Sequence, residues 1–174
     1  MSEKTCAFTG HRPQNLSFGF DEADRRCRKL KKVLKKQILG LIKNENVTHF
    51  ISGMALGVDM YAAEIVLGLK ARHHGITLEC AIPCGDQSTK WSKAMQERYA
   101  GIISKCDKKT LLQTAYTPGC MDRRNRYMVD NADLLISVWD GGAGGIGNTA
   151  GYALRQGKPV IVIDPLTLTV ERKQ

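Results

Sequence analysis

The chain has 174 residues, 43% hydrophobic and 25% charged, which predicts one globular domain with a full core and excludes a disordered or fibrous chain. The formal net charge is +9, but eight basic residues and no acidic one lie between Arg25 and Lys36. The rest of the chain therefore has 18 basic and 17 acidic residues, and its charge is nearly balanced. No apolar window approaches the roughly 20 residues of a membrane span and no signal sequence precedes the first apolar run, so we expect a cytoplasmic protein.

The first predicted strand covers residues 5–8 and is short and apolar, as is typical of a parallel strand buried on both faces. It leads into Gly10, His11 and Arg12, and Pro13 then blocks an immediate helix. If this strand is central, these residues lie above its carboxyl end, where open α/β sheets bind ligands. Arg12 suits a phosphate or carboxylate, and His11 suits the same anion or acid–base chemistry. The alternative is a surface ion pair and loop hydrogen bonds.

Residues 21–43 predict an amphipathic helix with Asp21 as a candidate N-cap. Its apolar residues recur at spacings of three and four, and they are Cys27, Leu30, Leu34, Ile38 and Leu41. The basic run occupies the opposite face. Such a run is usually a solvated helix face, and binding of nucleic acid or another acidic partner is the alternative.

A second strand at 47–51 leads into the segment SGMALGVD and a helix through about residue 70. Ser52 and the backbone at Gly53 and Gly57 are predicted to hold phosphate oxygens. Asp59 lies near the helix start, where a carboxylate either caps the helix or meets a ribose hydroxyl. The alternative is that the glycines only let helix and strand approach closely.

The third strand is predicted at 78–82, a loop at 83–87 follows it, and a helix covers 88–104. Gln87 and Trp91 would hydrogen-bond to and stack on a base, with a buried tryptophan as the alternative. A fourth strand at 109–113 precedes a helix at about 121–130, which carries Arg124.

A glycine-rich segment follows the fifth strand, at 134–139, and precedes a helix at 148–156 and a sixth strand at 160–163. Such a turn lets backbone N–H groups meet an anion at a helix N-terminus. The predicted phosphate-binding residues here are Asp140, Gly141, Gly142, Gly144, Gly145 and Asn148. The segment departs from G-x-G-x-x-G followed by a ribose-binding acid, so it does not predict a plain NAD site.

Six strands alternate with five helices, which predicts an α/β fold: one Rossmann-like domain over residues 1–174, with a doubly wound parallel sheet and helices on both faces. The six cysteines contain no C-x-x-C pair and several fall in apolar periodic positions. We therefore expect reduced thiols in the core, with neither disulfides nor a metal site.

The segments GHRP, SGMALGVD and the block from Met121 through the glycine run resemble the YpsA-like branch of the SLOG superfamily. That superfamily includes the DNA-processing protein DprA and the LOG phosphoribohydrolases. The resemblance spans nearly the whole chain. It implies a Rossmann-like fold that binds a nucleotide, nucleotide sugar or related ligand.

The resemblance to LOG can be followed residue by residue. Met121 and Arg124 match its M-x-x-R-K helix, and residues 140–145 occupy its P-G-G-x-G-T positions, while Asn148 stands at its glutamate position. A neutral amide stabilises an oxocarbenium-like state much less than a carboxylate does. The substitution therefore argues against LOG-type hydrolysis unless Asp59, Asp140 or His11 supplies the acid.

Three functions remain. The leading one is binding or sensing of a phosphate-bearing nucleotide or nucleotide sugar, in which Arg12 and Arg124 neutralise phosphate. The second is an N-glycosidase that uses Arg124 with an acid among Asp59, Asp140 and His11, and that needs no metal or organic cofactor. The third is a nucleic-acid-binding module built on the basic helix face. A homo-oligomer is compatible with each of them, and no membrane partner is expected.

Overall fold

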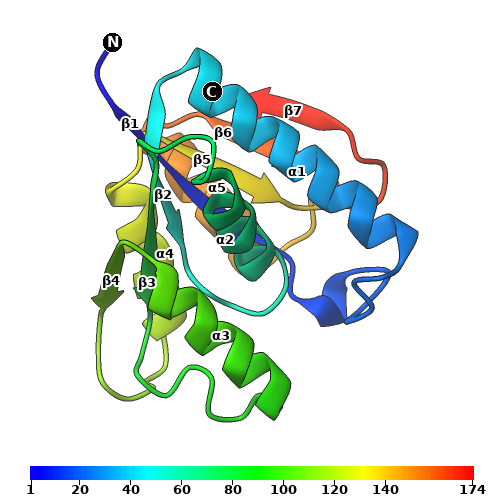
Figure 1. The fold of residues 1–174 in the computed structure, drawn as a ribbon, viewed down its shortest axis with the longest axis vertical. Coiled ribbons are helices and arrows are strands. Elements are labelled where there is room, and N and C mark those ends of the chain that lie inside the picture. Colours follow the sequence, from blue (N-terminus) through cyan, green and yellow to red (C-terminus); the bar gives the residue numbers. More distant parts are fainter.

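The computed structural model describes residues 1–174 and shows one seven-stranded sheet with helices on both faces (Figure 1). The strands are β1 (Lys4–Gly10), β2 (Val47–Ser52), β3 (Thr77–Ile82), β4 (Lys108–Leu111), β5 (Leu134–Val138), β6 (Val160–Ile163) and β7 (Val170–Lys173). The helices are the short 3₁₀ helix η1 (Pro13–Asn15), α1 (Arg25–Asn44), α2 (Val58–Leu69), α3 (Lys93–Lys105), α4 (Cys120–Asp130) and α5 (Gly145–Arg155).

The strand order is β4-β3-β2-β1-β5-β6-β7. All neighbouring strands are parallel except β6 and β7, which pair antiparallel from Val160↔Lys173 to Ile163↔Val170. The chain winds outward from β1 in one direction through β4 and then in the other from β5. The switch point of the sheet therefore lies between β1 and β5, whose carboxyl ends are at Gly10 and Val138.

The predicted α/β architecture is confirmed, but the predicted strand count of six is one too low. The missing strand, β7, is the four-residue sequence VERK, whose first three residues are exposed. A charged, exposed edge strand of this length has neither the alternation nor the apolar run by which strands are recognised.

Several predicted boundaries are wrong by a few residues because other side chains cap the helices. Asp24, not Asp21, caps α1 by accepting a hydrogen bond from the Arg26 N–H at 2.8 Å. Asp21 accepts one from the Ala23 N–H at 3.1 Å, within the preceding turn. Helix α3 begins five residues later than predicted, after Ser92, whose Oγ accepts from an N–H of the first turn at 3.3 Å.

Two further boundaries bear on the site. Helix α5 begins at Gly145 rather than residue 148, so Asn148 lies within its first turn. Strand β4 ends at Leu111, two residues short of the prediction. The first correction extends the α5 N-terminus into the glycine-rich segment.

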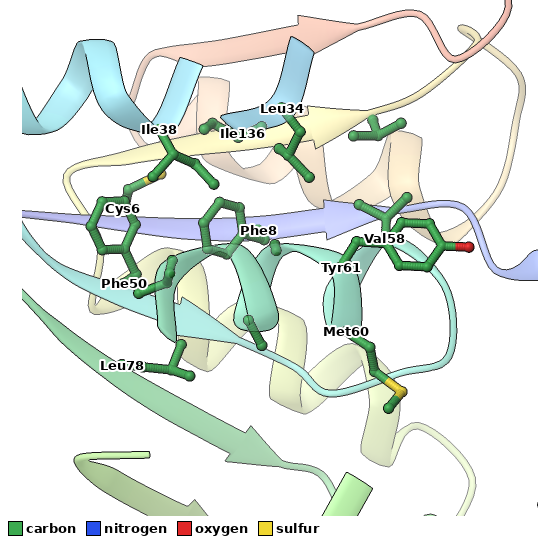
Figure 2. Packing of buried hydrophobic residues seen from close by; sticks show 14 of the residues in the cluster. Cys6, Phe8, Leu34, Ile38, Phe50, Val58, Met60, Tyr61, Leu78 and Ile136 are labelled. Carbon is green, nitrogen blue, oxygen red and sulfur yellow. The ribbon is translucent and has the colours of Figure 1, made fainter. Parts of the chain in front are cut away.

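The larger part of the core lies between the sheet and helices α1, α2 and α3, and Figure 2 shows its part beneath α1 and α2. Phe8 of β1 stacks on Phe50 of β2 with ring centroids 5.9 Å apart, and Leu34 and Ile38 of α1 are fully buried in the same cluster. A smaller cluster lies on the other face, beneath α4 and α5. All five apolar positions predicted for α1 are buried. The six cysteines are free and all except Cys106 are buried, as predicted.

A buried carboxylate anchors α4 to the sheet. Glu79 of β3 is 2% exposed, and its oxygens accept hydrogen bonds from Tyr127 of α4 at 2.6 Å, Thr110 of β4 at 2.6 Å and His49 of β2 at 2.9 Å. Burial alone would raise the pKa of Glu79, but these hydrogen bonds and the Lys108 charge lower it to about 2. Tyr127 lies one helical turn beyond Arg124, so this network helps to fix that arginine.

None of the helices combines the length and apolar composition needed to cross a membrane.

Candidate functional site

A cleft of about 500 Å³ opens at the carboxyl ends of β1 and β5, where the strand order reverses. Its walls come from four segments far apart in the sequence: the loop after β1, the turn before α2, helix α4, and the glycine-rich segment that leads into α5. Nine of the sixteen predicted site residues line it, and they are Gly10, His11, Arg12, Asp59, Arg124, Asp140, Gly142, Gly144 and Gly145.

Arg124 of α4 places a buried positive charge in the wall of the cleft. Its side chain is anchored but not neutralised: Nε donates to Asn125 Oδ1 at 2.8 Å, Nη1 donates to the Gly53 carbonyl, and no carboxylate oxygen lies within 4.0 Å. The residue is only 3% exposed. Burial lowers the pKa of Arg124 and the negative charge of Asp59 opposes this effect, yet a guanidinium remains charged at neutral pH.

Asp59 and Arg12 are the other charged residues near Arg124. Asp59 is 5% exposed, and its Oδ2 accepts the Ala55 N–H at 3.2 Å. Burial raises the pKa of Asp59, while the charges of Arg124 and Arg12 lower it. Arg12 is exposed and has no carboxylate within 4.0 Å. Two guanidinium groups against one carboxylate leave this part of the cleft net positive.

His11 and Asp140 form a second polar group in the wall of the cleft. The His11 side chain is 11% exposed, and neither ring nitrogen has a hydrogen-bond partner, although Nε2 lies 3.5 Å from Asp140 Oδ1. The Gly142 N–H donates to Asp140 Oδ1 at 2.9 Å and lowers the pKa of Asp140, as does the nearby His11. Buried polar atoms without partners are costly. The His11 ring therefore keeps unused hydrogen-bonding capacity in the wall of the cleft.

The glycine-rich segment brings a helix N-terminus and an aromatic ring to the cleft. Gly144 precedes α5 with φ of 137°, a backbone conformation that side-chain-bearing residues rarely adopt. Trp139, directly after β5, lines the cleft and donates its Nε1–H to the Gly142 carbonyl at 2.8 Å. The sequence predicted Trp139 as a strand residue. Its position just past the carboxyl end of a central strand was the available signal that it belongs to the site.

Three predicted residues support the cleft from behind without lining it. Ser52 Oγ donates to the Asp59 carbonyl at 2.8 Å and so holds the turn before α2. Gly53 packs against the Arg124 guanidinium, because a Cβ there would lie 2.7 Å from Cζ. Gly57 has φ of 89°, and a Cβ there would lie 2.6 Å from the His11 carbonyl oxygen. The three residues therefore hold the walls in place from behind, and the two glycines do so by letting neighbouring segments approach closely.

The remaining four lie outside the cleft. Gln87 Nε2 donates to the Gly53 carbonyl at 3.1 Å and its Oε1 accepts from Tyr99 at 3.0 Å, so both ends are occupied. Trp91 packs edge-on against Tyr99, with ring centroids 5.3 Å apart. Asn148 lines a separate hollow of about 220 Å³ between α4 and α5. Gly141 does not line the cleft either.

Several residues that line the cleft were not predicted, among them Thr9, Asn15, Asn125 and Trp139, and Met121, which matches the LOG helix pattern, lines it as well. Asn125 follows Arg124 directly and orients its side chain by accepting a hydrogen bond from Nε. The spacing of apolar residues in a helix does not predict such a polar contact.

Strand order and cleft together define a Rossmann-like α/β domain with a polar cleft at the topological switch point of its sheet. The YpsA family model, described as the YspA SLOG family, matches residues 6–156, and the chain belongs to this family. The resemblance carried by the three loops is thereby confirmed.

Curated relatives agree with this assignment. UPF0398 protein BH1768 of Halalkalibacterium halodurans is 31% identical over 139 residues, which cover 79% of this chain and 72% of the relative. The uncharacterised SPbeta prophage-derived protein YoqJ of Bacillus subtilis is 31% identical over 72% of this chain and 80% of its own length. UPF0398 protein YpsA of Bacillus subtilis is 25% identical over 97% of both chains.

Two solved structures share the fold. DNA processing protein A from Helicobacter pylori, described with its single-stranded DNA binding mode, superposes with a TM-score of 0.62 at 18% identity, over 92% of this chain and 65% of the larger one. The X-ray structure of TM1055 gives a TM-score of 0.53 at 16% identity, over 90% of this chain and 72% of that one. At these identities the similarity concerns the fold alone.

Proposed function

We propose that the cleft binds a phosphate-bearing nucleotide or nucleotide sugar. The observation that carries this proposal is Arg124, a buried guanidinium that lines the cleft without a carboxylate within 4.0 Å. Burying a charge without a partner costs several kcal/mol. An anionic ligand would supply the missing charge, and a phosphate matches the planar donor geometry of a guanidinium.

The surrounding groups fit the same ligand class. Arg12 lies near enough to add a second positive charge, and the α5 N-terminus at Gly145 adds about half of one. Trp139 offers an aromatic surface for a base or sugar, and Asp140 and Asp59 are the carboxylates available to ribose hydroxyls. The cleft volume of about 500 Å³ falls within the range of small-ligand sites.

Isothermal titration with AMP, ATP, NAD, ADP-ribose and UDP-glucose tests the proposal, together with a native mass spectrum to detect a co-purified nucleotide. Arg124→Gln should weaken binding about 10- to 150-fold, because a charge-assisted hydrogen bond contributes about 1.5–3 kcal/mol. Arg123→Gln is the matched control, since Arg123 is the exposed neighbour on α4 and does not line the cleft. Failure of every compound to bind at millimolar concentration would refute the proposal.

A second candidate, an N-glycosidase, is favoured by the His11–Asp140 pair, which places an acid–base couple in the cleft. The counter-observation is Asn148, which stands at the glutamate position of LOG and lies outside the cleft. Such an enzyme would use water to release free base from a nucleoside monophosphate, and Asp140→Asn would abolish the release. Chromatograms of AMP, CMP, GMP and UMP that stay unchanged after long incubation would exclude the activity on these substrates.

A further inference from the structure

Helix α1 carries the entire net charge of the protein. It contains nine basic residues and no acidic one, and the formal net charge of the whole chain is +9. The rest of the chain is therefore neutral. The helix lies on the outside of the sheet (Figure 1). Its apolar residues are buried or partly buried and most of its basic residues are exposed.

Most of this charge is not neutralised within the protein. Arg26 pairs with Asp24 at 2.9 Å and Lys31 with Glu22 at 2.6 Å, whereas the other seven basic residues have no carboxylate within 4.0 Å. We call these seven exposed residues the basic surface: Arg25, Arg28, Lys29, Lys32, Lys35, Lys36 and Lys43. Like charges three and four residues apart destabilise a helix. A helix selected only for solvation would gain stability from interspersed acids, so the arrangement points to an external polyanion.

A groove of about 610 Å³ borders the basic surface, between α1 and the end of α2. Lys35, Lys43, Arg72 and His73 line it and no acid does. Gly68 of α2 also lines the groove, although glycine inside a helix costs about 1 kcal/mol relative to alanine. A Cβ at Gly68 would meet nothing within 4 Å, so packing within the protein does not require glycine there. Its absence of a side chain leaves room beside the basic residues.

We propose that the basic surface binds the phosphate backbone of duplex nucleic acid, independently of the cleft. A helix of 20 residues is about 30 Å long, and it presents cations in each turn from Arg25 to Lys36 and again at Lys43. A duplex carries one phosphate charge per about 1.7 Å of its axis, counting both strands, and a straight helix laid against it meets the few phosphates of each strand that face it. The basic surface consists only of Lys and Arg, so we expect it to contact phosphates without sequence preference.

The composition of α1 separates duplex nucleic acid from the other polyanions. Single-strand binders stack bases on aromatic side chains, and α1 contains none. Helices that lie in a membrane interface expose large apolar residues for insertion, and none of the exposed large hydrophobic residues of this protein belongs to α1.

Fluorescence anisotropy of a labelled 20-base-pair DNA duplex, titrated at 25 to 200 mM NaCl, tests the proposal. The triple variant Lys32→Gln/Lys36→Gln/Lys43→Gln removes three cations of the basic surface. The control Lys90→Gln/Lys105→Gln/Lys109→Gln removes three exposed, unpaired cations near α3 and β4 and has the same net charge. Each phosphate contact contributes about −0.9 to the slope of log K against log salt. The first variant should therefore reduce the magnitude of the slope by about 2.7 and weaken binding at least tenfold at 50 mM, while the control changes neither.

Gly68→Glu provides an independent variant. It places an acid beside the basic surface at a position where a side chain meets nothing, and glutamate is the better helix former, so the fold should be retained while duplex affinity falls. Three outcomes would overturn the proposal: no duplex binding at 25 mM NaCl, equal losses in the two triple variants, or tighter binding of a 20-nucleotide single strand than of the duplex. Adsorption to phosphatidylserine vesicles without duplex binding would also overturn it, in favour of a membrane surface.

Discussion

Gly53→Ala is the sharpest test of how the cleft is built, because it moves Arg124 without removing it. A Cβ at Gly53 would lie 2.7 Å from both Cζ and Nη1 of Arg124 and 2.8 Å from Nε. Gly53 does not have a positive φ, so its backbone accepts alanine. The atoms that clash are the end of a flexible side chain. We therefore expect the guanidinium to be displaced while the backbone of β2 stays in place.

The expected effects on stability and on binding differ in size. Displacement breaks the hydrogen bond from Arg124 Nη1 to the Gly53 carbonyl, which contributes about 1 kcal/mol to folding. The carbonyl keeps its second donor, Gln87 Nε2 at 3.1 Å, so it is not left without a partner. A lost guanidinium–phosphate contact costs about 1.5–3 kcal/mol, which corresponds to about 10- to 150-fold in affinity.

The assay combines urea unfolding with calorimetric titration of AMP and ADP-ribose. Gly101→Ala is the control, because a Cβ at that position of α3 meets nothing within 4 Å. Gly53→Ala should lose ligand affinity to about the same extent as Arg124→Gln, with a free energy of unfolding lower by about 1 kcal/mol. If the variant folds and binds as tightly as the wild type, Arg124 does not contact the ligand and the proposed phosphate position is wrong.

Two further predictions concern the scaffold. The pKa of Glu79 is about 2 in the fold against an ordinary value of 4.5, so its stabilisation, at most about 3 kcal/mol, is complete above pH 4.5 and is lost as the pH falls towards 2. Urea unfolding between pH 2 and 7 should show a shallower acid decline in Glu79→Gln, and an unchanged decline would contradict the assignment. Gly10→Ala should destabilise by about 2–3 kcal/mol, since its Cβ would lie 2.5 Å from Val58 Cγ1 and 2.6 Å from its Cβ. Equal unfolding midpoints for Gly10→Ala and Gly101→Ala would contradict the tight packing of β1 on α2.

The periodicity of apolar residues was sufficient to predict the architecture, because the central elements are buried in a regular way. Every residue of β5 is buried, and the apolar stripe of α1 faces the core as its spacing indicates. The periodicity of apolar residues does not predict features that polar side chains determine, such as where a helix begins. Asp24 rather than Asp21 begins α1, and the exposed charged residues of β7 form a strand only because β6 presents a free edge to them.

The site was predicted in part for a similar reason. Residues directly after central strands, such as His11 and Asp140, reach the cleft because the sheet brings the carboxyl ends of parallel strands to one edge. Gln87 follows β3, which is two strands away from the switch point, and its amide is occupied by Gly53 and Tyr99. Which of the two tryptophans faces the cleft depends on strand order, which a single sequence does not display.

The glycines around the cleft serve two different purposes, and the distinction bears on what the cleft is for. Gly10 and Gly57 are required by the protein itself, since a Cβ at either would collide with Val58 or with the His11 backbone. Gly145, the first residue of α5, is not required in this way, because a Cβ there would meet nothing within 4 Å. Glycine at this position also weakens the helix. Neither packing nor a positive φ explains Gly145. The proposed ligand would explain it, because a phosphate at this end of the cleft would approach the N–H groups of α5 closely.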